Sequence, residues 1–424
     1  MLVAFETLGC RLNQAETASL AGAFEQLGFE VTDDVESADV FIVHSCAVTL
    51  AAEQQGRRLL RRAQRLGRHR LVVFTGCAAE VTSTETLTAD GAQLIVPQDQ
   101  KDQLPQIVAA RLGLAPTPLA GVPLPSFNKT RALVKVQDGC DFRCAYCIIP
   151  DTRGDPRSRP FDDIITEART LADQGFREII LAGVNVATYN DRNRTLADLI
   201  RALAAIDRLQ RIRLGSIEPA TTEREIVDLC VAESKLCRTL HYPLQSGDAG
   251  ILRAMRRRYN PAMFAATLDY ALARVPQIGL GTDVITGFPG EDEAAFAATR
   301  SLIERYPFSN LHVFPYSERP GTPATELQES VPVHIRRERA RELMTIGQAK
   351  RAAFAATWLD QTVSMIVERI DSDGTARGWT GEYLALQLAD APADAVGRLV
   401  SVKVAQVLDS QLFANWQDAT IIDD

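Results

Sequence analysis

Three cysteines near the middle of the chain constrain it more than any other feature. Cys140, Cys144 and Cys147 have the spacing Cys-x3-Cys-x2-Cys and follow directly on a predicted strand. Three thiolates at this spacing fit three corners of a 4Fe-4S cluster, and no fourth cysteine lies nearby in the sequence. One iron is then open to the amino and carboxylate groups of a methionine moiety. A zinc knuckle or buried thiols are the alternatives, but zinc usually takes four protein ligands and the chain lacks a second Cys-x2-Cys pair.

The composition is that of an ordinary globular protein. Of the 424 residues, 46% are hydrophobic and 24% are charged, and the length allows two or three domains. No run approaches the roughly 18 apolar residues of a membrane span, and residues 1–10 lack the features of a secretory signal. We therefore expect a cytoplasmic protein with no membrane partner. Thiols stay reduced there, so the eight cysteines are expected to bind metal or do chemistry.

The first part of the chain, residues 1–115, alternates short apolar runs with helical patterns. This alternation predicts an α/β fold with a doubly wound, mostly parallel sheet. The expected strands are Leu2–Leu8, Asp39–Cys46, Leu71–Cys77 and Gln93–Pro97. The expected helices are Glu16–Leu27, Ala51–Leu66 and Lys101–Leu112. Residues 116–130 contain four prolines and are expected to form a linker.

The second part, residues 131–355, repeats strand–helix units. The expected strands are Ala132–Asp138, Glu178–Val184, Ile212–Ile217, Thr239–Leu244, Ile278–Ile285 and Asn310–Tyr316. Six units predict an open or partial parallel (β/α)6 barrel, with function at the carboxyl ends of its strands. A complete eight-stranded barrel is the alternative, although two further units are not found.

The last part, residues 356–424, changes character. Ser364–Ile370, Glu382–Leu388 and Arg398–Leu408 alternate apolar and polar residues, with turn signals between them. This pattern predicts a small antiparallel β-barrel.

Three further cysteines each close a predicted strand of the first sheet. They are Cys10, Cys46 and Cys77. The carboxyl ends of parallel strands share one edge of an open sheet, which is where ligands bind. We therefore expect the three thiols to converge on a second cluster, with three small buried residues as the alternative.

Several longer motifs resemble known families. They are Gly139–Cys147, Thr7–Gln14, Thr75–Cys77, Cys147–Pro150 leading into Arg153-Gly154 and Arg157-Ser158-Arg159, Gly287–Glu291, and Phe314–Ala324. The central triplet resembles the radical S-adenosylmethionine superfamily, and the whole set resembles its methylthiotransferase family over nearly the full chain. The resemblance implies an amino-terminal cluster domain, a radical barrel, and a TRAM-like terminal β-barrel of the kind that binds RNA.

The superfamily resemblance also implies residues that bind S-adenosylmethionine. Tyr146 would place its backbone against the adenine, and the others lie at the ends of successive predicted strands. They are Gly183 and Asn185, Ser216 and Glu218, and Gln245 and Ser246. Each of these motifs alone fits a plain strand end equally well.

The family resemblance implies radical insertion of sulfur and a methyl group at an unactivated C–H bond. Such enzymes use two 4Fe-4S clusters and two S-adenosylmethionine molecules per product. An electron donor such as flavodoxin or ferredoxin and a sulfur source would be partners. Residues 253–260 resemble the branch that acts on C2 of N6-threonylcarbamoyladenosine at position 37, in the tRNA anticodon arm. Isopentenyl-adenosine in tRNA, an aspartate of a ribosomal protein, and a non-catalytic iron–sulfur RNA-binding role remain alternatives.

The RNA contacts are expected from arginines. The candidates are Arg57, Arg58, Arg61, Arg62, Arg65, Arg256, Arg257 and Arg258. Phosphate binding favours such basic surface, although a solvated arginine face is an equal alternative for the first five. The net charge of −8 argues weakly against nucleic acid, and residues 361–424 carry ten acids against four bases. That balance does not favour RNA binding by the last domain.

Five other positions are of interest. His44 stands where relatives commonly have asparagine, and Ala78 begins an unusual Ala-Ala-Glu, so both could alter the environment of a cluster. Cys230 and Cys237 are expected to be core or surface thiols. Asp283, at the end of the fifth barrel strand, either faces the pocket or caps a turn.

Overall fold

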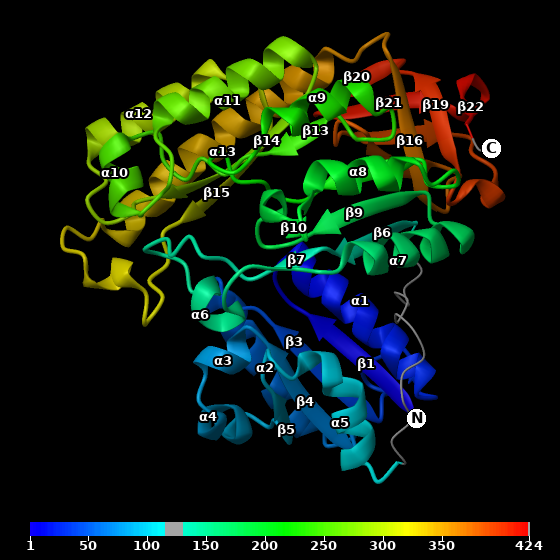
Figure 1. Ribbon diagram of the computed structural model, residues 1–424, viewed down its shortest axis with the longest axis vertical. Coiled ribbons are helices and arrows are strands. Elements are labelled where there is room, and N and C mark those ends of the chain that lie inside the picture. The colour runs from blue at the N-terminus through cyan, green and yellow to red at the C-terminus, as the bar shows by residue number, and fades with distance from the viewer. Residues whose placement is uncertain (115–129, 423–424) are drawn as a thin grey trace.

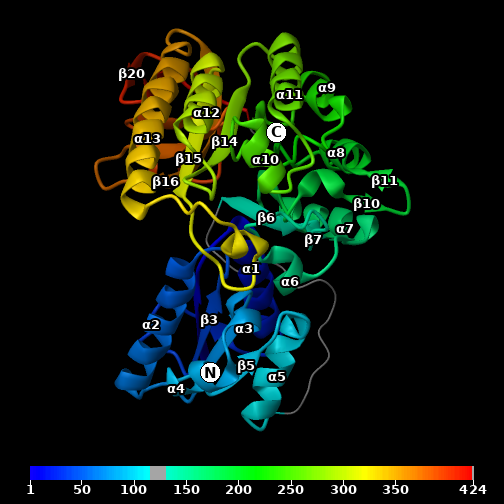
Figure 2. The same cartoon turned by 90° about the vertical axis from the view of Figure 1, so that its left-hand side faces the viewer.

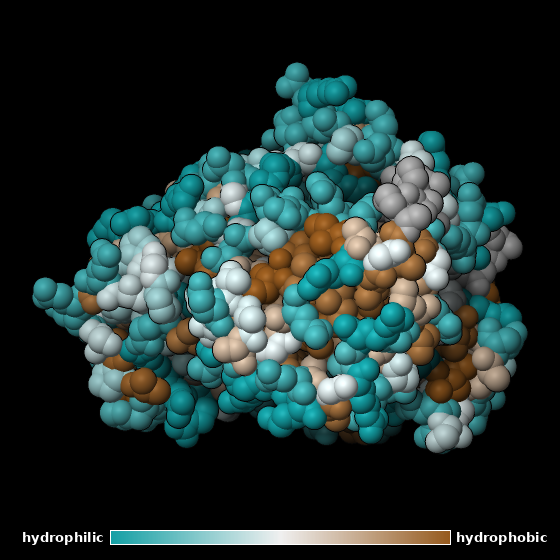
Figure 3. All heavy atoms as spheres, turned by 90° about the horizontal axis from the view of Figure 1, so that it is seen from below, coloured by the Kyte–Doolittle hydropathy of each residue, from teal (hydrophilic) through white to brown (hydrophobic). Residues whose placement is uncertain are grey.

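The computed structural model describes residues 1–114 and 130–422. In Figure 1 the first part of the chain lies at the bottom, the middle part above it, and the last part at the upper right. Figure 2 shows the same arrangement from the side, and Figure 3 shows brown apolar side chains among teal polar ones on the lower face. None of the helices within the described ranges is long and apolar enough to cross a membrane. The expected linker lies outside the described residues, apart from Thr130.

The amino-terminal domain is a five-stranded parallel sheet in the order β2-β1-β3-β4-β5. Its strands are β1 (Leu2–Thr7), β2 (Glu30–Val31), β3 (Val40–Ser45), β4 (Leu71–Gly76) and β5 (Leu94–Val96). Its helices are α1 (Arg11–Gln26), α2 (Leu50–Leu66), α3 (Ala78–Val81), α4 (Thr84–Ala89) and α5 (Leu104–Arg111). Every residue of β3 and β4 is buried, because helices cover both faces of the sheet.

This domain confirms the four strands expected from the sequence and adds β2, which is too short to show a pattern. Helix α1 begins at Arg11, five residues before the expected start, because the chain turns straight into a helix after Cys10. The turn depends on Gly9, whose φ is +105°.

The middle domain contains six parallel strands around an open barrel. The strands are β6 (Arg131–Lys135), β9 (Glu178–Ala182), β12 (Arg211–Leu214), β13 (Thr239–His241), β14 (Gly279–Thr286) and β15 (Phe308–Pro315). They form two three-stranded sheets, β12-β9-β6 and β13-β14-β15, which the bridges Ile212–Leu236 and Ser216–His241 connect. The partial barrel is therefore confirmed, with its strands in chain order.

Helices cover the outside of this barrel. They are α7 (Phe161–Asp173), α8 (Leu196–Ala204), α9 (Arg224–Ala232), α10 (Ala249–Ala254), α11 (Pro261–Arg274), α12 (Glu293–Arg305) and α13 (Val333–Ala356). Short elements lie near the cysteine triplet, namely β7 (Gln137–Asp138), α6 (Ile149–Arg153) and β8 (Arg157–Ser158), and the hairpin β10 (Asn190–Asp191) and β11 (Arg194–Thr195) follows β9. Helix α1 packs its apolar residues Leu12 and Ala15 against Ala182, so the amino-terminal domain lies against the barrel.

The carboxyl-terminal domain is a curled seven-stranded sheet in the order β20-β21-β18-β17-β16-β19-β22. Its strands are β16 (Thr362–Ile370), β17 (Ala376–Thr380), β18 (Ala385–Ala389), β19 (Leu399–Lys403), β20 (Gln406–Leu408), β21 (Gln411–Asn415) and β22 (Thr420–Ile421). The sheet is antiparallel as expected, except that β18 and β21 pair in parallel. That one pair could not be expected from alternation alone, because alternation does not report strand direction.

The carboxyl-terminal domain is joined to the barrel by buried arginines. Arg213 on β12 donates to the Thr380 carbonyl at 2.9 Å and binds Glu178 Oε1 through Nε at 2.8 Å. Arg211 on the same strand donates to the Trp379 carbonyl at 3.0 Å. Glu178 therefore anchors the cations that hold the last domain in place.

Candidate active site between two cysteine sets

A cavity of about 630 Å³ lies where the three domains meet. It extends from the two sets of cysteines into the interior of the barrel. Its lining includes Cys10 and Arg11 from the amino-terminal domain, Tyr146 and Cys147 from the central loop, inward-facing residues of the barrel strands, and Tyr383 from the last domain.

The three amino-terminal cysteines converge at the carboxyl edge of the first sheet. Gly9 packs directly on Cys46, since a Cβ at Gly9 would stand 2.8 Å from Cys46 Sγ. Burial, with smaller contributions from the nearby Cys10 and Cys77 thiols, raises the pKa of the Cys46 thiol to about 11. Burial also raises the pKa of the Cys10 thiol, and Cys77 again contributes. The three thiols are therefore neighbours at this edge of the sheet, as ligands at different corners of one cluster have to be.

A buried ion network lies beside this set. Arg153, at the end of α6, donates from Nε to Cys77 Sγ at 3.1 Å. Its other nitrogens bind Glu16 at 3.0 Å and Asp138 at 2.8 Å. Glu16 also binds Lys101 at 2.5 Å and Lys135 at 2.8 Å. Burial by itself would raise the pKa of the Glu16 carboxyl, but the attraction of these cations is larger. The pKa of Glu16 therefore lies well below its usual range, and the carboxylate is ionised.

The central cysteines lie in a tight loop after β7. Gly139 has a φ of +70°, and a Cβ there would lie 2.1 Å from the Asp155 carbonyl oxygen. Arg257 donates from Nη1 to Cys144 Sγ at 3.1 Å and forms an ion pair with Glu218. Burial raises the pKa of the Cys147 thiol to about 12.

Both cysteine sets therefore suit an iron–sulfur cluster. Each offers three thiols without a fourth, and each has one arginine that donates to a sulfur. A guanidinium stabilises thiolate sulfur, and hydrogen bonds to sulfur are among the contacts that tune such clusters. The thiols that have no arginine donor have raised pKa values, so bound metal would have to supply the positive charge that holds them ionised.

The residues expected to bind S-adenosylmethionine fall into two groups. Four of them line the cavity, namely Tyr146, Gly183, Ser216 and Gln245. Asn185 is buried outside the cavity lining, and its Oδ1 accepts a hydrogen bond from the Glu218 backbone N–H at 3.3 Å. Ser246 packs outward, with its Oγ 3.3 Å from Thr299 Oγ1 on α12. Glu218 is held by Arg257.

The arginines expected to bind RNA also divide. Arg57 and Arg61 are paired with Asp90, at 2.6 and 2.7 Å. Arg62 faces Glu36 at 3.3 Å. Arg58 and Arg65 are exposed, and no acidic partner for either is found in the described parts of the chain. Arginines of α2 are thus partly used in ion pairs within the protein, which leaves Arg58 and Arg65 for other contacts.

The second arginine group contains one clear correction. Arg257 is buried, with 2% of its side chain exposed, and contacts Cys144 and Glu218. It is therefore not available to bind RNA. Arg256 is exposed, and Arg258 pairs with Asp141 at 3.2 Å.

The other positions of interest are also placed. His44 is fully buried and lies 2.7 Å from Thr17 Oγ1, and burial lowers its pKa to about 3. It faces the Glu16 network rather than the cysteines. Ala78 begins α3, directly after Cys77. Cys230 and Cys237 are both buried in the barrel domain.

Two cavity residues were not anticipated from the sequence. His241 and His312 both lie next to Asp283, whose side chain faces the cavity rather than a turn. Their positions on alternate, inward-facing sites of neighbouring strands are the only signal the sequence offers.

The sequence comparisons agree with this arrangement. The pattern described as "Radical SAM superfamily" matches residues 134–303, and "Uncharacterized protein family UPF0004" matches residues 2–97. The threonylcarbamoyladenosine tRNA methylthiotransferase MtaB of Bacillus subtilis is 32% identical, covering 95% of this chain and 93% of that protein. The protein of the same name from Aquifex aeolicus is 34% identical, covering 84% and 90%.

The chain belongs to the radical S-adenosylmethionine methylthiotransferases. Membership implies a 4Fe-4S cluster and S-adenosylmethionine as cofactors. A third relative of this methylthiotransferase bears a different name. The tRNA-2-methylthio-N(6)-dimethylallyladenosine synthase of Acetivibrio thermocellus is 30% identical, covering 96% of this chain and 89% of that protein.

Solved structures share the fold of this methylthiotransferase. The radical S-adenosylmethionine methyltransferase TsrM from Kitasatospora setae, with cobalamin and a [4Fe-4S] cluster bound, has a TM-score of 0.58 at 16% identity. The match covers 76% of each chain.

Proposed function

We propose that this methylthiotransferase acts on C2 of N6-threonylcarbamoyladenosine at position 37 of tRNA. The C2–H bond is replaced by C2–S–CH3. The relatives named for threonylcarbamoyladenosine match at 32% and 34% identity over most of their length, which supports this choice of base. Two S-adenosylmethionine molecules are consumed per product, one as methyl donor and one as radical source.

The observation that carries the proposal is that two sets of three cysteines meet at one cavity, which Cys10 lines from the first set and Cys147 from the second. Cys140, Cys144 and Cys147 would hold the cluster whose electron cleaves S-adenosylmethionine to a 5′-deoxyadenosyl radical. The other three, from the first sheet, would hold a second cluster that carries the sulfur. An aromatic C2–H is neither acidic nor a hydride donor, so polar catalysis alone gives little help, and a radical source next to a sulfur carrier removes that limit.

The protein's own residues then have distinct roles. Arg257 holds Cys144 and is itself held by Glu218, which fixes the loop that carries the triplet. Arg153 does the same for Cys77. Ile285 and Phe314 contribute apolar side chains to the cavity lining and help to keep water from the reacting carbon.

The tRNA anticodon arm, an electron donor such as flavodoxin or ferredoxin, and a sulfur source are the partners that this chemistry requires. Arg58 and Arg65 are the exposed cations of α2 that remain for phosphate contacts.

Nucleoside mass spectrometry tests the proposal. A strain that lacks this protein should lose 2-methylthio-N6-threonylcarbamoyladenosine, and the wild-type gene should restore it. A gene carrying Cys144→Ala should not. Loss of the methylthio group from isopentenyl-adenosine or from a ribosomal protein instead would assign the other branches of the family.

Iron and sulfide analysis of the anaerobically reconstituted protein tests the second cluster. We expect about eight irons per chain, since each 4Fe-4S cluster holds four. Fewer than about four would contradict both clusters, and a value near four would leave only one.

A further inference from the structure

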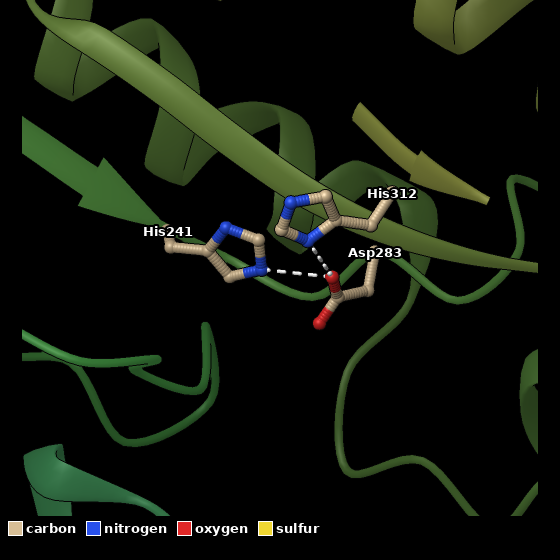
Figure 4. Close-up of side chains that lie close together, drawn as sticks. All are labelled: His241, Asp283 and His312. Atoms are coloured by element: carbon tan, nitrogen blue, oxygen red, sulfur yellow. Dashed lines mark hydrogen bonds and ion pairs between the residues drawn. The ribbon is translucent and has the colours of Figure 1, made fainter. Parts of the chain in front are cut away.

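His241, Asp283 and His312 form one cluster inside the cavity. They come from the neighbouring strands β13, β14 and β15, where Asp283 is the register partner of His312. Side chains alternate between the two faces of a strand, so Gly281, Asp283 and Ile285 all face the cavity. Figure 4 shows both imidazoles directed at the Asp283 carboxylate.

The geometry is that of two donors on one acceptor. His241 Nε2 and His312 Nδ1 each lie 3.0 Å from Asp283 Oδ1. His241 can lean across because its register partner is Gly281, where a Cβ would lie 2.5 Å from His241 Nδ1. Burial raises the pKa of Asp283, but the two imidazoles outweigh it and hold the pKa below its usual range. Asp283 is therefore an ionised carboxylate inside the cavity.

A second set of contacts fixes the tautomer of His312. Arg351 donates to Asn310 Oδ1 at 3.2 Å, so the Asn310 amide nitrogen faces His312 Nε2 at 2.9 Å. The Asn310 amide donates, so His312 Nε2 must accept, which leaves the His312 proton on Nδ1, directed at Asp283. Both hydrogen bonds therefore converge on Oδ1. No partner of Asp283 Oδ2 is found in the described parts of the chain, so this oxygen is left to accept a hydrogen bond from a ligand.

The cavity changes character along its length. One inward position beyond Asp283 and His312 stand Ile285 and Phe314, which are apolar. Of the two arginines that line the cavity within the described ranges, Arg213 is paired with Glu178 and Arg11 contacts the Tyr383 hydroxyl at 2.6 Å. The cavity thus offers an apolar section, then an anionic acceptor, together with a guanidinium that has no acidic partner among the described residues.

We propose that His241, Asp283 and His312 select the substrate by accepting a hydrogen bond from a polar substituent at N6 of the target adenosine. This inference rests on the proposed function. On the six-membered ring of adenine only N1 separates C2 from C6, so a cavity that receives C2 also receives the N6 substituent. A threonylcarbamoyl group carries N–H and O–H donors for Asp283 and a carboxylate that suits Arg11. An isopentenyl group carries none of these and would bury the Asp283 carboxylate without a partner, which is costly.

The selection gives the choice of base a physical reason beyond sequence identity, since relatives of the two names match this chain at 34% and 30% identity. Sites that hydrogen-bond a substrate group reject the analogue lacking it far better than apolar pockets reject a small size difference. The cluster is a positioning device, since it holds the substituent and not the reacting carbon.

The test compares one tRNA in two forms, with N6-threonylcarbamoyladenosine or unmodified adenosine at position 37. Dissociation constants come from fluorescence anisotropy, and kcat and KM from anaerobic assays of the reconstituted enzyme. His312→Leu is the test variant, and His334→Leu, on the exposed face of α13, is the matched control. Iron content equal to wild type confirms that each variant is folded.

We expect the wild-type protein and His334→Leu to prefer the modified tRNA. His312→Leu should lower kcat/KM on that tRNA by about 10- to 100-fold, mainly by raising KM. This fold-change corresponds to the loss of one or two hydrogen bonds. Its kcat/KM on the unmodified tRNA should fall much less, so the preference for the modified tRNA narrows. Should His312→Leu fail to fold, Asp283→Asn, which keeps the side-chain volume, is read in the same way.

Three results would overturn the inference. An equal loss on both tRNAs would show a merely structural role. A preference that survives in the folded variant would place selection elsewhere. A divalent ion kept by the dialysed wild-type protein and lost from His312→Leu would make the cluster a metal site, since its ligand atoms all lie within 4.8 Å of one another. Absence of wild-type methylthiolation of the tRNA that carries N6-threonylcarbamoyladenosine would instead refute the proposed function.

Discussion

Arg153 and Cys77 meet across the boundary between two domains, with the guanidinium Nε 3.1 Å from the sulfur. Arg153 ends α6, which begins two residues after Cys147. Ile148, in the same stretch, packs into the amino-terminal core beside Cys77. One short segment thus runs from the central cysteine set to the amino-terminal one, and the two sets are held in a fixed relation.

Replacing Arg153 should weaken the amino-terminal cluster selectively. We expect Arg153→Met to reduce the reconstituted iron content from about eight to about four per chain, because Cys77 loses its donor and its neighbouring positive charge. The cleavage of S-adenosylmethionine without tRNA should persist. A variant with full iron content would show that the contact is not needed to hold that cluster.

Removing Glu16 should destabilise the whole chain. Its carboxylate binds Lys101, Lys135 and Arg153 in a buried site. Glu16→Gln keeps the volume but leaves three cations without their shared partner. We expect a loss of about 3–5 kcal/mol in the free energy of unfolding, as for other broken buried ion pairs. Urea titration of the protein without clusters measures it, and Glu30→Gln, at an exposed position of the same domain, is the comparison.

Acid should loosen the carboxyl-terminal domain. Burial raises the pKa of Glu178, but Arg213, Arg211 and Arg131 outweigh it and keep the pKa below its usual value. A lowered folded-state pKa means that the stabilisation is fully present above the unfolded value of about 4.3 and is lost as pH falls through the folded value. Limited proteolysis with an acid-active protease between about pH 5 and pH 2 should release the last domain first as the pH falls below about 4. Glu178→Gln should be sensitive already at pH 5, and equal sensitivity of both proteins throughout would contradict this assignment.

The exposed arginines of α2 should contribute to tRNA binding without sequence preference. We expect the double variant Arg58→Gln and Arg65→Gln to weaken binding several-fold and to reduce the salt dependence of the dissociation constant by up to two ions. Arg57→Gln with Arg61→Gln is the matched control, because those side chains are paired with Asp90. A larger effect from the control pair would point to the fold of the helix and not to phosphate contacts.

Much of the architecture was predictable because it follows from local patterns. Apolar runs that alternate with helices located the strands, and the cysteines at strand ends converge because parallel strands share an edge. Arg257 was not predictable. The arginine run resembles a solvated face, yet Arg256 adopts a left-handed φ of 57° after α10, and the next side chain turns inward to Cys144.

The cluster of His241, Asp283 and His312 in the cavity was also not predictable from the sequence. His241 and His312 are 71 residues apart and neither lies in a motif. Their meeting at Asp283 depends on the register between β13, β14 and β15, which long-range packing sets and no local pattern encodes. Of the three residues, the sequence marks only Asp283, at the end of a predicted strand, and strand position alone does not determine whether its side chain faces the pocket.

The short helix α6 also limits how these sequences can diverge. Each helical residue adds about 1.5 Å and turns the next side chain by about 100°, so one inserted residue between Cys147 and Arg153 would carry the guanidinium away from Cys77. The number of residues between that cysteine and that arginine should therefore stay constant among chains that keep both cysteine sets, even where the residues themselves drift. Counting that interval is a way to recognise distant members whose other motifs have eroded.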